Sequence, residues 1–358
     1  MQILIKLLRL LPPEKAHALS LAALRRGFFP RGADKAPDAL LMQRILGLDF
    51  PHPIGLAAGF DKNAEAVVPL LRAGFAFVEA GTVTPLPQSG NPEPRLFRIP
   101  QARAVINRLG FNNDGLEAFC ARLAETANDP LVRKRVVGAN VGCNKDAKDK
   151  IADFVKGVAA VSELADYVTI NISSPNTPGL RGLQNRAELE HLLSEVQKTR
   201  AHLSAKPSLL VKISPDLDEA GLQAIADVAI KAKVDGLIIS NTTISRPAGL
   251  PEDIAKQAGG LSGAPLFDLS NKVLARMYQL TKGKLPLIGV GGVGSAEDAY
   301  KKIRAGASLV QLYTALIYEG PGLIAKIKAG LVKLLQRDGF KNVSEAVGAD
   351  IAAKRLSG

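Results

Sequence analysis

Tryptophan is absent from the 358-residue sequence, aromatic residues make up only 5% of it, and there are only two cysteines. Few aromatics leave few surfaces on which single-stranded nucleic acid could stack. No zinc-finger, basic-heptad or RNA-binding motif is present either, so we expect no nucleic-acid partner. Cys120 and Cys143 lack the number and spacing of a disulfide framework or a zinc site. We therefore expect no metal, and a reducing compartment is the simplest setting.

Long uncharged runs are also missing from the leucine-rich N-terminal segment. The chain carries a net charge of +12, and residues 1–35 hold seven Lys or Arg against two Asp or Glu, a local net charge of +5. The longest uncharged run there, residues 16–24, has nine residues, whereas a membrane span needs about 20. The charges also interrupt the apolar stretch that a signal peptide requires. We expect the segment neither to cross a bilayer nor to act as a signal peptide.

Two short helices are predicted in this segment. Leu4, Leu7, Leu8 and Leu11 fall on one face of a helix, and Pro13 can open a second helix over residues 14–26. Two interpretations remain open. The pair packs against the main domain, or it lies as a monotopic hairpin in an anionic membrane surface, with its cations at the head groups. Residues 27–39, rich in Gly, Pro and charge, are predicted to form a linker.

Beyond residue 50, eight short apolar runs predict buried strands. They span residues 54–59, 77–82, 136–142, 167–173, 208–213, 236–242, 285–291 and 309–314. Eight strands separated by helical patterns favour an α/β protein of the (β/α)8 TIM barrel type. A doubly wound sheet is the main alternative, but it would normally have fewer strands. It would also carry a Gly-x-Gly-x-x-Gly turn after the first strand, and that motif is missing.

A helical pattern follows each strand, at residues 62–73, 113–127, 149–163, 185–203, 217–232, 268–281, 295–304 and 321–337. Two starts show capping chemistry, because Asn185 is followed three residues later by Glu188, and Ser295 by Asp298. We expect both pairs to form capping boxes. Three connections, about 83–112, 174–184 and 243–267, are unusually long and follow strands. They would lie on the carboxyl rim of the barrel, where long loops are usually functional.

Polar residues near the strand ends predict a ligand site on that rim. Amides carry donors and acceptors in one plane, which suits a pyrimidine or a flavin, and six asparagines qualify: Asn107, Asn112, Asn140, Asn171, Asn176 and Asn241. Lys62 ends the first strand, and Lys212 interrupts an apolar one, where a lysine is costly to bury unless it is paired. The two cations favour an anionic ligand or a developing anion.

A glycine-rich stretch, GVGGVGS at residues 289–295, follows the seventh predicted strand, and LYT at residues 312–314 ends the eighth. In such barrels, backbone N–H groups and a helix N-terminus at this place hold a phosphate. The sequence therefore predicts a phosphorylated ligand.

From about residue 12 to residue 350, ordered motifs resemble the class 2 dihydroorotate dehydrogenases, the quinone-dependent flavoenzymes of pyrimidine biosynthesis. The motifs are GLAAGFDKNAEAV, FVEAGTVTPLPQSGNPEPRLFR, AVINRLGFNN, NISSPNTPGLRGLQ, VKISPDL, NTTISRP, GGLSG, IGVGGV and IRAGASLVQLYTALIYEGP. The resemblance implies a (β/α)8 barrel with FMN at the carboxyl ends of the strands. It also implies an N-terminal helical pair that touches the membrane and forms a quinone tunnel.

The resemblance assigns roles residue by residue. FMN would contact Ala58, Gly59, Phe60, Asp61, Lys62, Thr82, Asn140, Asn171, Lys212, Ser240, Gly263, Gly292, Tyr313 and Thr314. Dihydroorotate would contact Lys62, Asn107, Arg108, Leu109, Gly110, Phe111, Asn171, Asn176, Asn241 and Thr242. The quinone tunnel would include His17, Arg98 and Tyr313.

The resemblance also implies a mechanism in which Ser174 is the catalytic base. It would remove the C5 proton of dihydroorotate while a hydride leaves C6 for N5 of FMN, giving orotate. A membrane quinone would reoxidise the flavin, which predicts ping-pong kinetics. Class 1 relatives have cysteine at this position. Serine is a weak base with no visible activating partner in the sequence, so it must depend on positioning, with Thr177 as a candidate proton relay.

Two positions depart from the family pattern. Cys143 stands where many relatives have lysine, and this change could alter one contact near the flavin. Ser240 replaces a commoner threonine and keeps the hydroxyl group.

Two rival functions are compatible with the residues alone. One is a Schiff-base lyase that uses Lys212 and would be colourless, whereas a flavoenzyme is yellow. The other is a non-catalytic adapter built on the basic N-terminal helices.

The resemblance divides the chain into an N-terminal helical pair (1–30), a linker and lead-in (31–52) and the FMN-binding barrel (53–358). We expect a monomer that is peripheral on an anionic membrane surface, at the cytoplasmic face of a bacterial inner membrane.

Overall fold

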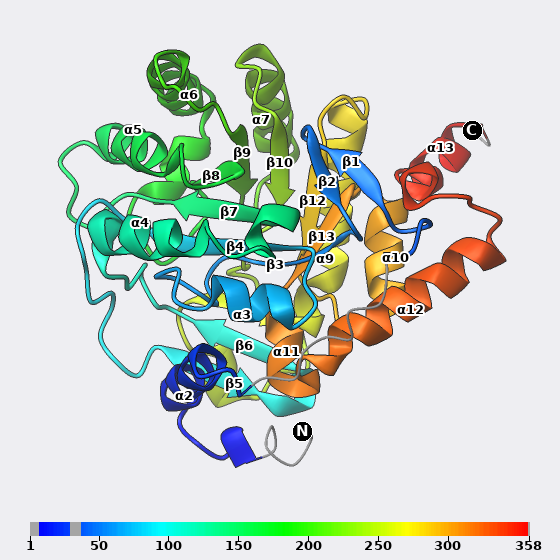
Figure 1. Cartoon of the computed structure of the whole chain (residues 1–358), viewed down its shortest axis with the longest axis horizontal. Coiled ribbons are helices and arrows are strands. Elements are labelled where there is room, and N and C mark those ends of the chain that lie inside the picture. The colour runs from blue at the N-terminus through cyan, green and yellow to red at the C-terminus, as the bar shows by residue number, and fades with distance from the viewer. Residues whose placement is uncertain (1–6, 29–36, 357–358) are drawn as a thin grey trace.

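Eight parallel strands close into a barrel in the computed structural model, which describes residues 7–28 and 37–356 (Figure 1). Around the barrel, each strand pairs with its neighbours in sequence order, and the last returns to the first, with Val310 opposite Ile54. The strands are β3 (Ile54–Leu56), β4 (Phe77–Val83), β7 (Val136–Val141), β8 (Tyr167–Asn171), β9 (Ser208–Ile213), β10 (Gly236–Ile239), β12 (Leu287–Val290) and β13 (Leu309–Leu312). The predicted (β/α)8 barrel is confirmed.

Helices surround the barrel and connect its strands. They are α3 (Val67–Arg72), α4 (Gly115–Thr126), α5 (Lys150–Val161), α6 (Arg186–Ala201), α7 (Glu219–Lys231), α9 (Phe267–Leu280), α10 (Ala296–Arg304) and α12 (Gly322–Arg337), with α8 (Glu252–Ala255), α11 (Thr314–Glu319) and α13 (Ala349–Leu356) added. Short 3₁₀ turns occupy residues 100–102, 132–134, 180–184, 264–266 and 343–346. The predicted helix over 62–73 begins later than expected, because residues 58–66 form turns at the rim.

Of the two predicted capping boxes, the one at Ser295 is present at the start of α10. The Ser295 hydroxyl accepts a hydrogen bond from the backbone N–H of Asp298 at 3.0 Å, while the Asp298 carboxylate accepts from the N–H of Gly294, also at 3.0 Å. Helix α6 does begin directly after Asn185, but in the described structure the Asn185 side chain caps no N–H of the first turn. The Asn185 capping box is therefore wrong.

The barrel interior is filled by large side chains that need glycines opposite them. A Cβ atom on Gly55 would lie 2.3 Å from the ring of Phe77, and one on Gly138 would lie 2.1 Å from the ring of Tyr167. These are impossible contacts, so neither position accepts a side chain while the rings keep their places. Phe77 and Tyr167 pack with Leu210, Ile238, Ile288 and Leu309 inside the barrel.

An antiparallel hairpin closes the amino end of the barrel, in the region predicted as linker and lead-in. Strands β1 (Gln43–Ile45) and β2 (Leu48–Phe50) pair with Gln43 opposite Phe50. The ring of Phe50 meets that of Phe77 edge to face, with centroids 5.3 Å apart. The Gln43 amide also donates to the carbonyl of Ser308 at 2.6 Å. The hairpin thus covers the interior layer, and the ligand site is left to the opposite end.

A three-stranded antiparallel sheet, also not predicted, stands at the carboxyl rim. Two of the long connections supply its strands β5 (Leu96–Ile99), β6 (Ala104–Asn107) and β11 (Gly260–Gly263). Strand β6 lies between the others, with Ala104 opposite both Ile99 and Gly263. The connections were expected at the rim, but the sequence did not reveal that they pair with each other.

Helix α2 (Pro13–Arg25) lies beside β5, away from the β1–β2 hairpin (Figure 1). It starts one residue earlier and ends one residue earlier than predicted. Arg95 forms an ion pair with Glu14 at 2.9 Å, and Arg98 donates to the carbonyl groups of Leu8 and Leu11. Arg25 also pairs with Glu65 at 2.9 Å.

The structure describes only part of the predicted first helix and of the predicted linker. In the predicted first helix, Leu7 and Leu8 are helical, and Leu4 lies outside the described residues. Residues 29–36 of the predicted linker also lie outside them. Within the described chain, no helix combines the length and apolar character that a membrane crossing demands.

Candidate active site

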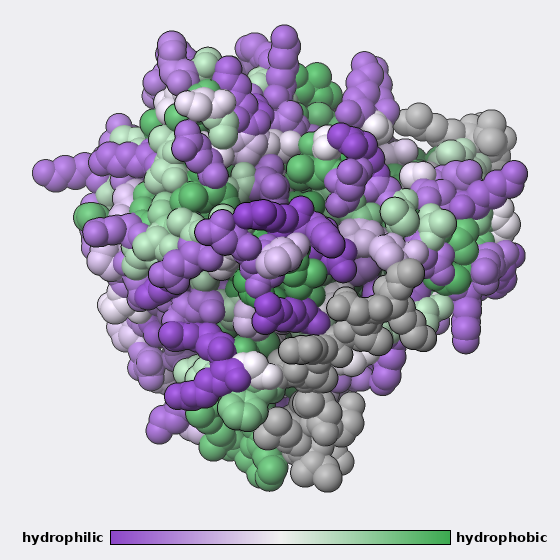
Figure 2. Space-filling model, in the orientation of Figure 1, coloured by the Kyte–Doolittle hydropathy of each residue, from purple (hydrophilic) through white to green (hydrophobic). Residues whose placement is uncertain are grey.

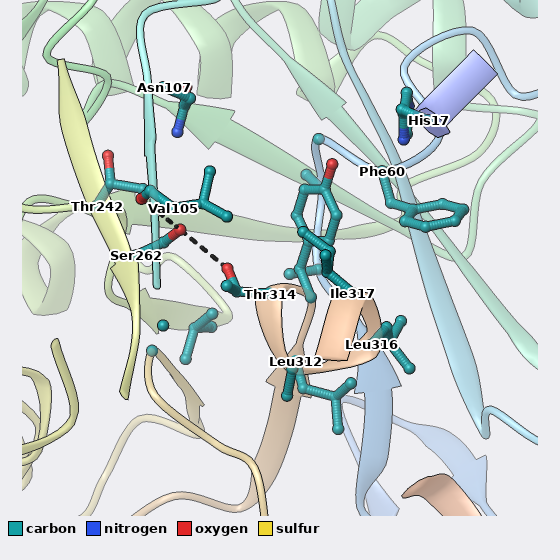
Figure 3. Close-up of a pocket in the computed structure, with 18 of the residues that line it drawn as sticks. His17, Phe60, Val105, Asn107, Thr242, Ser262, Leu312, Thr314, Leu316 and Ile317 are labelled. Atoms are coloured by element: carbon teal, nitrogen blue, oxygen red, sulfur yellow. Dashed lines mark hydrogen bonds between the residues drawn. The ribbon is translucent and has the colours of Figure 1, made fainter. Parts of the chain in front are cut away.

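A cavity of about 550 Å³ runs from α2 to the carboxyl ends of the barrel strands. One part of its wall comes from α2 and the residues before it, another from the three-stranded sheet, and the rest from the strand ends. In Figure 3, His17 and Phe60 stand on one side of the cavity and Asn107 and Thr242 on the other. The barrel rim and the N-terminal helix therefore share one continuous space.

Three groups predicted to converge do line this one cavity. Ser174 follows β8, Lys212 lies on β9, and the loop Gly291–Ser295 follows β12. Because parallel strands of a closed barrel end on the same rim, residues far apart in sequence meet there.

The Lys212 ammonium group is buried without a protein partner. The side chain is 4% exposed, and its Nζ makes no hydrogen bond or ion pair with any residue that the structure describes. Burial lowers its pKa, an effect that the charge of Glu79 partly opposes. Asn171 lies opposite Lys212 in the β8–β9 register, so the two side chains leave neighbouring strands on the same face. A buried cation without a partner needs acceptors or an anion from a ligand.

Lys62 is the second cation of the cavity. Burial, and to a smaller extent the charge of Arg95, lowers its pKa to about 8, while Glu14 and Asp61 act in the opposite direction. The site can therefore hold a proton on Lys62 below that pH and attract a carboxylate.

A polar layer lies directly beneath the cavity. The buried Glu79 carboxylate accepts hydrogen bonds from Asn140 at 2.6 Å, Gln311 at 2.7 Å and Tyr167 at 3.0 Å. Burial, and then the charge of Glu79, raises the pKa of Tyr167 well above its usual value. Asn140 in turn accepts from Thr82 at 2.5 Å and from Asn171 at 3.2 Å. This layer fixes the orientation of the amides above it.

The glycine loop has the features of an anion site. Gly291, Gly292 and Gly294 line the cavity at the N-terminus of the nine-residue helix α10. A Cβ atom on Gly294 would lie 3.7 Å from Nη2 of Arg103, so a guanidinium group stands beside the loop. Across the cavity, the Thr314 hydroxyl donates to that of Ser262 at 2.9 Å (Figure 3). Backbone N–H groups and the helix N-terminus suit a phosphate here.

Ser174 has surroundings that position it but do not activate it. The side chain is 5% exposed, and its hydroxyl accepts from the backbone N–H of Asn176 at 3.2 Å. Among the described residues, no His, Asp, Glu or Lys side chain is hydrogen-bonded to it. The Thr177 hydroxyl is buried nearby in sequence without a protein hydrogen-bond partner in the described structure. The Asn176 amide donates to the carbonyl of Asn107 at 3.1 Å, which links the serine loop to the three-stranded sheet.

Aromatic rings line the cavity between the barrel rim and the N-terminal helix α2. The ring of Phe60 lies 5.3 Å from that of His17 and 5.5 Å from that of Tyr313, edge to face in both cases. Burial, and then the charge of Lys62, lowers the pKa of His17 to about 3, so its imidazole is neutral near pH 7. Burial also raises the pKa of Tyr313. The cations near this end of the cavity are therefore Lys62, Arg98 and Arg9.

Most of the predicted site residues line the cavity, but Asp61, Asn140, Arg108, Asn112 and Thr177 do not. Asp61 is buried and accepts from the N–H groups of Glu65 and Ala66 at 2.8 and 2.7 Å, so it shapes the turn after β3. Asn140 belongs to the layer beneath. Arg108 turns outward, where it donates to the carbonyl of Pro94 at 2.8 Å and lies over the ring of Phe97.

Cys143, predicted as a change near the flavin, belongs to the hydrophobic core instead of the cavity wall. Burial raises the pKa of its thiol to about 11, so it is not a nucleophile at neutral pH.

Sequence reasoning missed several wall residues, namely Arg103, Val105, Ser262, Leu266, Leu316 and Ile317. Ser262 lies in the GGLSG motif next to Gly263, so its position in that motif was a usable signal. The apolar residues give no such signal, because they resemble core residues in the sequence.

The fold and the cavity define the class of protein. It is a (β/α)8 barrel with a ligand site at the carboxyl rim. The family model described as Dihydroorotate dehydrogenase matches residues 40–335. The chain is 53% identical over 349 residues to the dihydroorotate dehydrogenase (quinone) of Azorhizobium caulinodans, covering 96% of this chain and 97% of the relative. It is also 53% identical to the mitochondrial dihydroorotate dehydrogenase (quinone) of Oryza sativa subsp. japonica, covering 98% of this chain and 80% of that protein.

Solved structures agree with these relatives. A crystal structure of the Eimeria tenella dihydroorotate dehydrogenase in complex with ferulenol is 42% identical, with a TM-score of 0.92, and covers 95% of this chain and 96% of that one. The chain therefore belongs to the dihydroorotate dehydrogenase family, and its resemblance to the quinone-dependent class is confirmed.

Proposed function

We propose that the protein oxidises dihydroorotate to orotate with bound FMN and passes the electrons to a membrane quinone. The observation that carries this proposal is the convergence of Ser174, the unpartnered Lys212 and the glycine loop on one cavity that continues to α2. Membership of the family and the names of the quinone-dependent relatives support the substrate and the acceptor.

The cavity residues fit FMN on three grounds. Lys212 lacks a partner, as a group that binds a ligand acceptor would. In the loop Gly291–Ser295 at the start of α10, the N–H groups that Asp298 and Ser295 do not already bind would hold a phosphate. Asn171, held by hydrogen bonds to Thr82 and Asn140, lines the cavity where a flavin edge would lie. FMN, when bound, supplies the two-electron acceptor of the reaction.

The roles proposed for the protein residues come from the family resemblance and agree with their places along the cavity. Lys62 attracts the substrate carboxylate, and Asn107, Asn176, Asn241 and Thr242 orient the ring. Ser174 takes the C5 proton while the hydride leaves C6, so the product gains its C5=C6 double bond. The hydroxyl of Thr177, which has no protein partner in the described structure, would carry the proton onward. Leu109, Gly110 and Phe111 line the proposed substrate side of the cavity.

The second half-reaction uses the other end of the cavity. We infer that the quinone enters between α2 and the rim, past His17, Phe60 and Tyr313, with Arg98 near the entrance. Residues 1–30 thus form the membrane-associating part, and residues 53–358 the catalytic barrel. Release of orotate before the quinone binds would give ping-pong kinetics, which we expect.

The test is anaerobic flavin reduction by dihydroorotate, followed by absorbance in a stopped-flow instrument. In the Ser174→Ala variant we expect FMN to stay bound and the reduction rate to fall by about 10²- to 10⁴-fold, the usual contribution of a positioned base. The exposed Ser204→Ala is the matched control and should reduce its flavin at the normal rate. Normal reduction in Ser174→Ala would remove Ser174 from the mechanism. A wild-type flavin that dihydroorotate does not reduce would contradict the function itself.

A further inference from the structure

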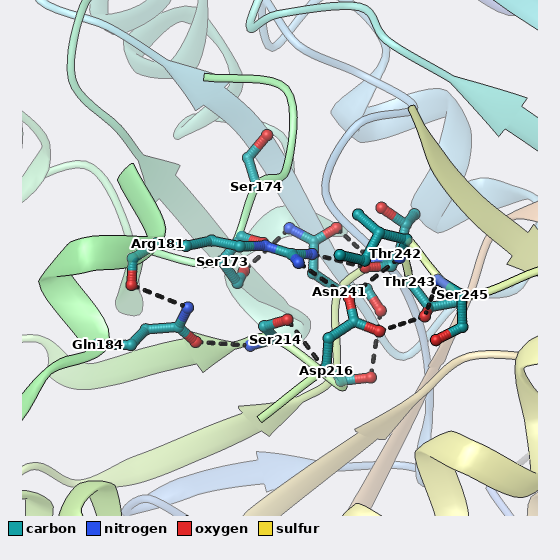
Figure 4. Close-up of polar contacts among 12 residues, drawn as sticks. Ser173, Ser174, Arg181, Gln184, Ser214, Asp216, Asn241, Thr242, Thr243 and Ser245 are labelled. Carbon is teal, nitrogen blue, oxygen red and sulfur yellow. Dashed lines mark hydrogen bonds and ion pairs between the residues drawn. The ribbon is translucent and has the colours of Figure 1, made fainter. Parts of the chain in front are cut away.

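Arg181 and Asp216 form an ion pair behind the cavity, at a distance of 2.8 Å (Figure 4). Arg181 lies in the connection after β8, and Asp216 just after the end of β9. Their side chains are 23% and 11% exposed, so the pair is largely shielded from water. Neither residue lines the cavity, and the proposed reaction uses neither of them directly.

The Arg181 guanidinium group binds two backbone carbonyls as well as Asp216. Its Nε donates to the carbonyl of Ser173 at 3.0 Å, and its Nη2 donates to that of Thr242 at 3.1 Å. Ser173 precedes the proposed base, and Thr242 is a proposed substrate contact. One rigid planar group therefore sets the spacing between the base loop and the loop after β10.

Asp216 belongs to a third segment, after β9, and links the same guanidinium group to the loop after β10. Its carboxylate accepts from the Thr243 hydroxyl and, at 3.0 Å, from the backbone N–H of Ile244. Its own N–H donates to the Ser214 hydroxyl at 3.1 Å. The Ser214 N–H donates to the Gln184 amide at 2.8 Å, which returns to the Arg181 segment. The pair and its partners tie together the ends of β8, β9 and β10.

We propose that Arg181, held by Asp216, is a positioning residue that fixes the backbone of Ser174 relative to the substrate-binding loop. The inference rests on the proposed function. Figure 4 shows the Ser174 side chain directed away from the guanidinium group. Arg181 therefore acts through the carbonyl of the preceding residue and not on the hydroxyl itself.

The physical reason lies in the weakness of serine as a base. Without a partner that lowers its pKa, its contribution depends on the geometry of approach, and a displacement of about 1 Å can cost on the order of 10²-fold in rate. A guanidinium group holds several acceptors at fixed angles through charge-assisted hydrogen bonds, whereas a lysine offers one mobile point charge.

The test compares Arg181→Met, Arg181→Lys and Asp216→Asn in the FMN-loaded enzyme. The matched control is Arg186→Met, which breaks the exposed Arg186–Asp227 pair between α6 and α7, 2.6 Å long. At saturating dihydroorotate, we expect flavin reduction to slow by about 10- to 100-fold in both Arg181 variants. A smaller loss is expected in Asp216→Asn, which keeps its acceptor oxygen and its shape. Reoxidation of the flavin by quinone should stay normal in all of them.

An isotope effect separates positioning from general damage. With dihydroorotate deuterated at C5, flavin reduction in the Arg181 variants should show a larger isotope effect than in the wild type, because removal of the C5 proton becomes slower. Loss of structure alone would reduce the FMN content and slow both half-reactions, but it would leave the isotope effect on flavin reduction unchanged.

The outcomes are distinguishable. Flavin reduction in Arg181→Met and Asp216→Asn at the rate of Arg186→Met would overturn the inference. Equal slowing of both half-reactions with an unchanged isotope effect would also overturn it, in favour of a structural role. If wild-type flavin is not reduced by dihydroorotate at all, the proposed function fails first, independently of Arg181.

Discussion

Single residues in this chain show how burial decides the state of an ionisable group. His52 is 4% exposed and lies between β2 and β3. Its Nδ1 accepts from the backbone N–H of Ile54 at 3.3 Å, so Nε2 carries the proton and donates to the carbonyl of Gly74 at 3.0 Å. Burial, and then the charges of Lys328 and Arg135, lowers the pKa of His52 to about 3. The fold therefore accepts this imidazole only in its neutral form.

This depressed pKa predicts how stability depends on pH. The unfolded chain binds a proton at His52 below about pH 6.5, whereas the folded chain does not until about pH 3, so stability is lost as the pH falls through that window. Between pH 7.5 and pH 5 the loss due to His52 should be about 2 kcal/mol. Urea unfolding at both pH values should show a smaller difference for His52→Gln. The exposed His191→Gln should behave as the wild type, and an equal pH response in His52→Gln would contradict the assignment.

At the scale of elements, two helices with the same sequence signal begin differently. Helix α10 starts at Ser295, whose hydroxyl accepts from the N–H of Asp298. Helix α6 starts after Asn185, whose side chain caps no N–H of the first turn in the described structure. The capping pattern located both helix starts, but only the packing around each start determined which side chain bonds.

The two caps predict different costs of substitution. Ser295→Ala should lower the free energy of unfolding by about 1 kcal/mol, because one backbone N–H loses its acceptor. Asn185→Ala should change it by no more than a few tenths of a kcal/mol, since no such bond is lost. Chemical denaturation of the two variants side by side measures the difference. A cost for Asn185→Ala as large as that for Ser295→Ala would mean that the Asn185 side chain does cap α6.

At the scale of the whole molecule, hydrophobic side chains gather on the surface at the end where α2 lies (Figure 2). The strongly exposed ones in this part are Leu7, Leu10, Leu11, Leu19 and Phe28, with Leu10 81% exposed. Lysine and arginine side chains occur in the same segment. An apolar surface beside basic residues favours the anionic-membrane interpretation over simple packing of α2 against the domain.

A vesicle experiment tests this surface. The full chain should sediment with vesicles that contain anionic lipid, and the double substitution Leu10→Asp and Leu19→Asp should reduce binding by about 10-fold or more, because both charges would have to leave water. Ile230→Asp on α7 is the control, since Ile230 is also exposed but lies on another part of the molecule. Flavin reduction by soluble dihydroorotate should not change. Equal vesicle binding by the wild type, the double variant and Ile230→Asp would contradict the membrane interpretation and leave α2 with a purely structural role.

The sequence predicted the barrel because its signals are local. Apolar runs, turn residues and helical periodicity recur eight times, and a closed barrel is the arrangement that pairs every such strand. The polar residues at strand ends, such as Asn171, Lys212 and Gly291, then had to share the carboxyl rim. Which residues form the rim could therefore be predicted without coordinates.

Tertiary structure alone decided what those residues touch. The pairing of Ala104 with Gly263, the outward turn of Arg108 and the Arg181–Asp216 pair join residues distant in sequence. Such contacts depend on how long loops close and on the direction in which each side chain leaves its backbone. Neither is encoded in local periodicity, because any of several partners would satisfy the same buried donor or charge until packing selects one.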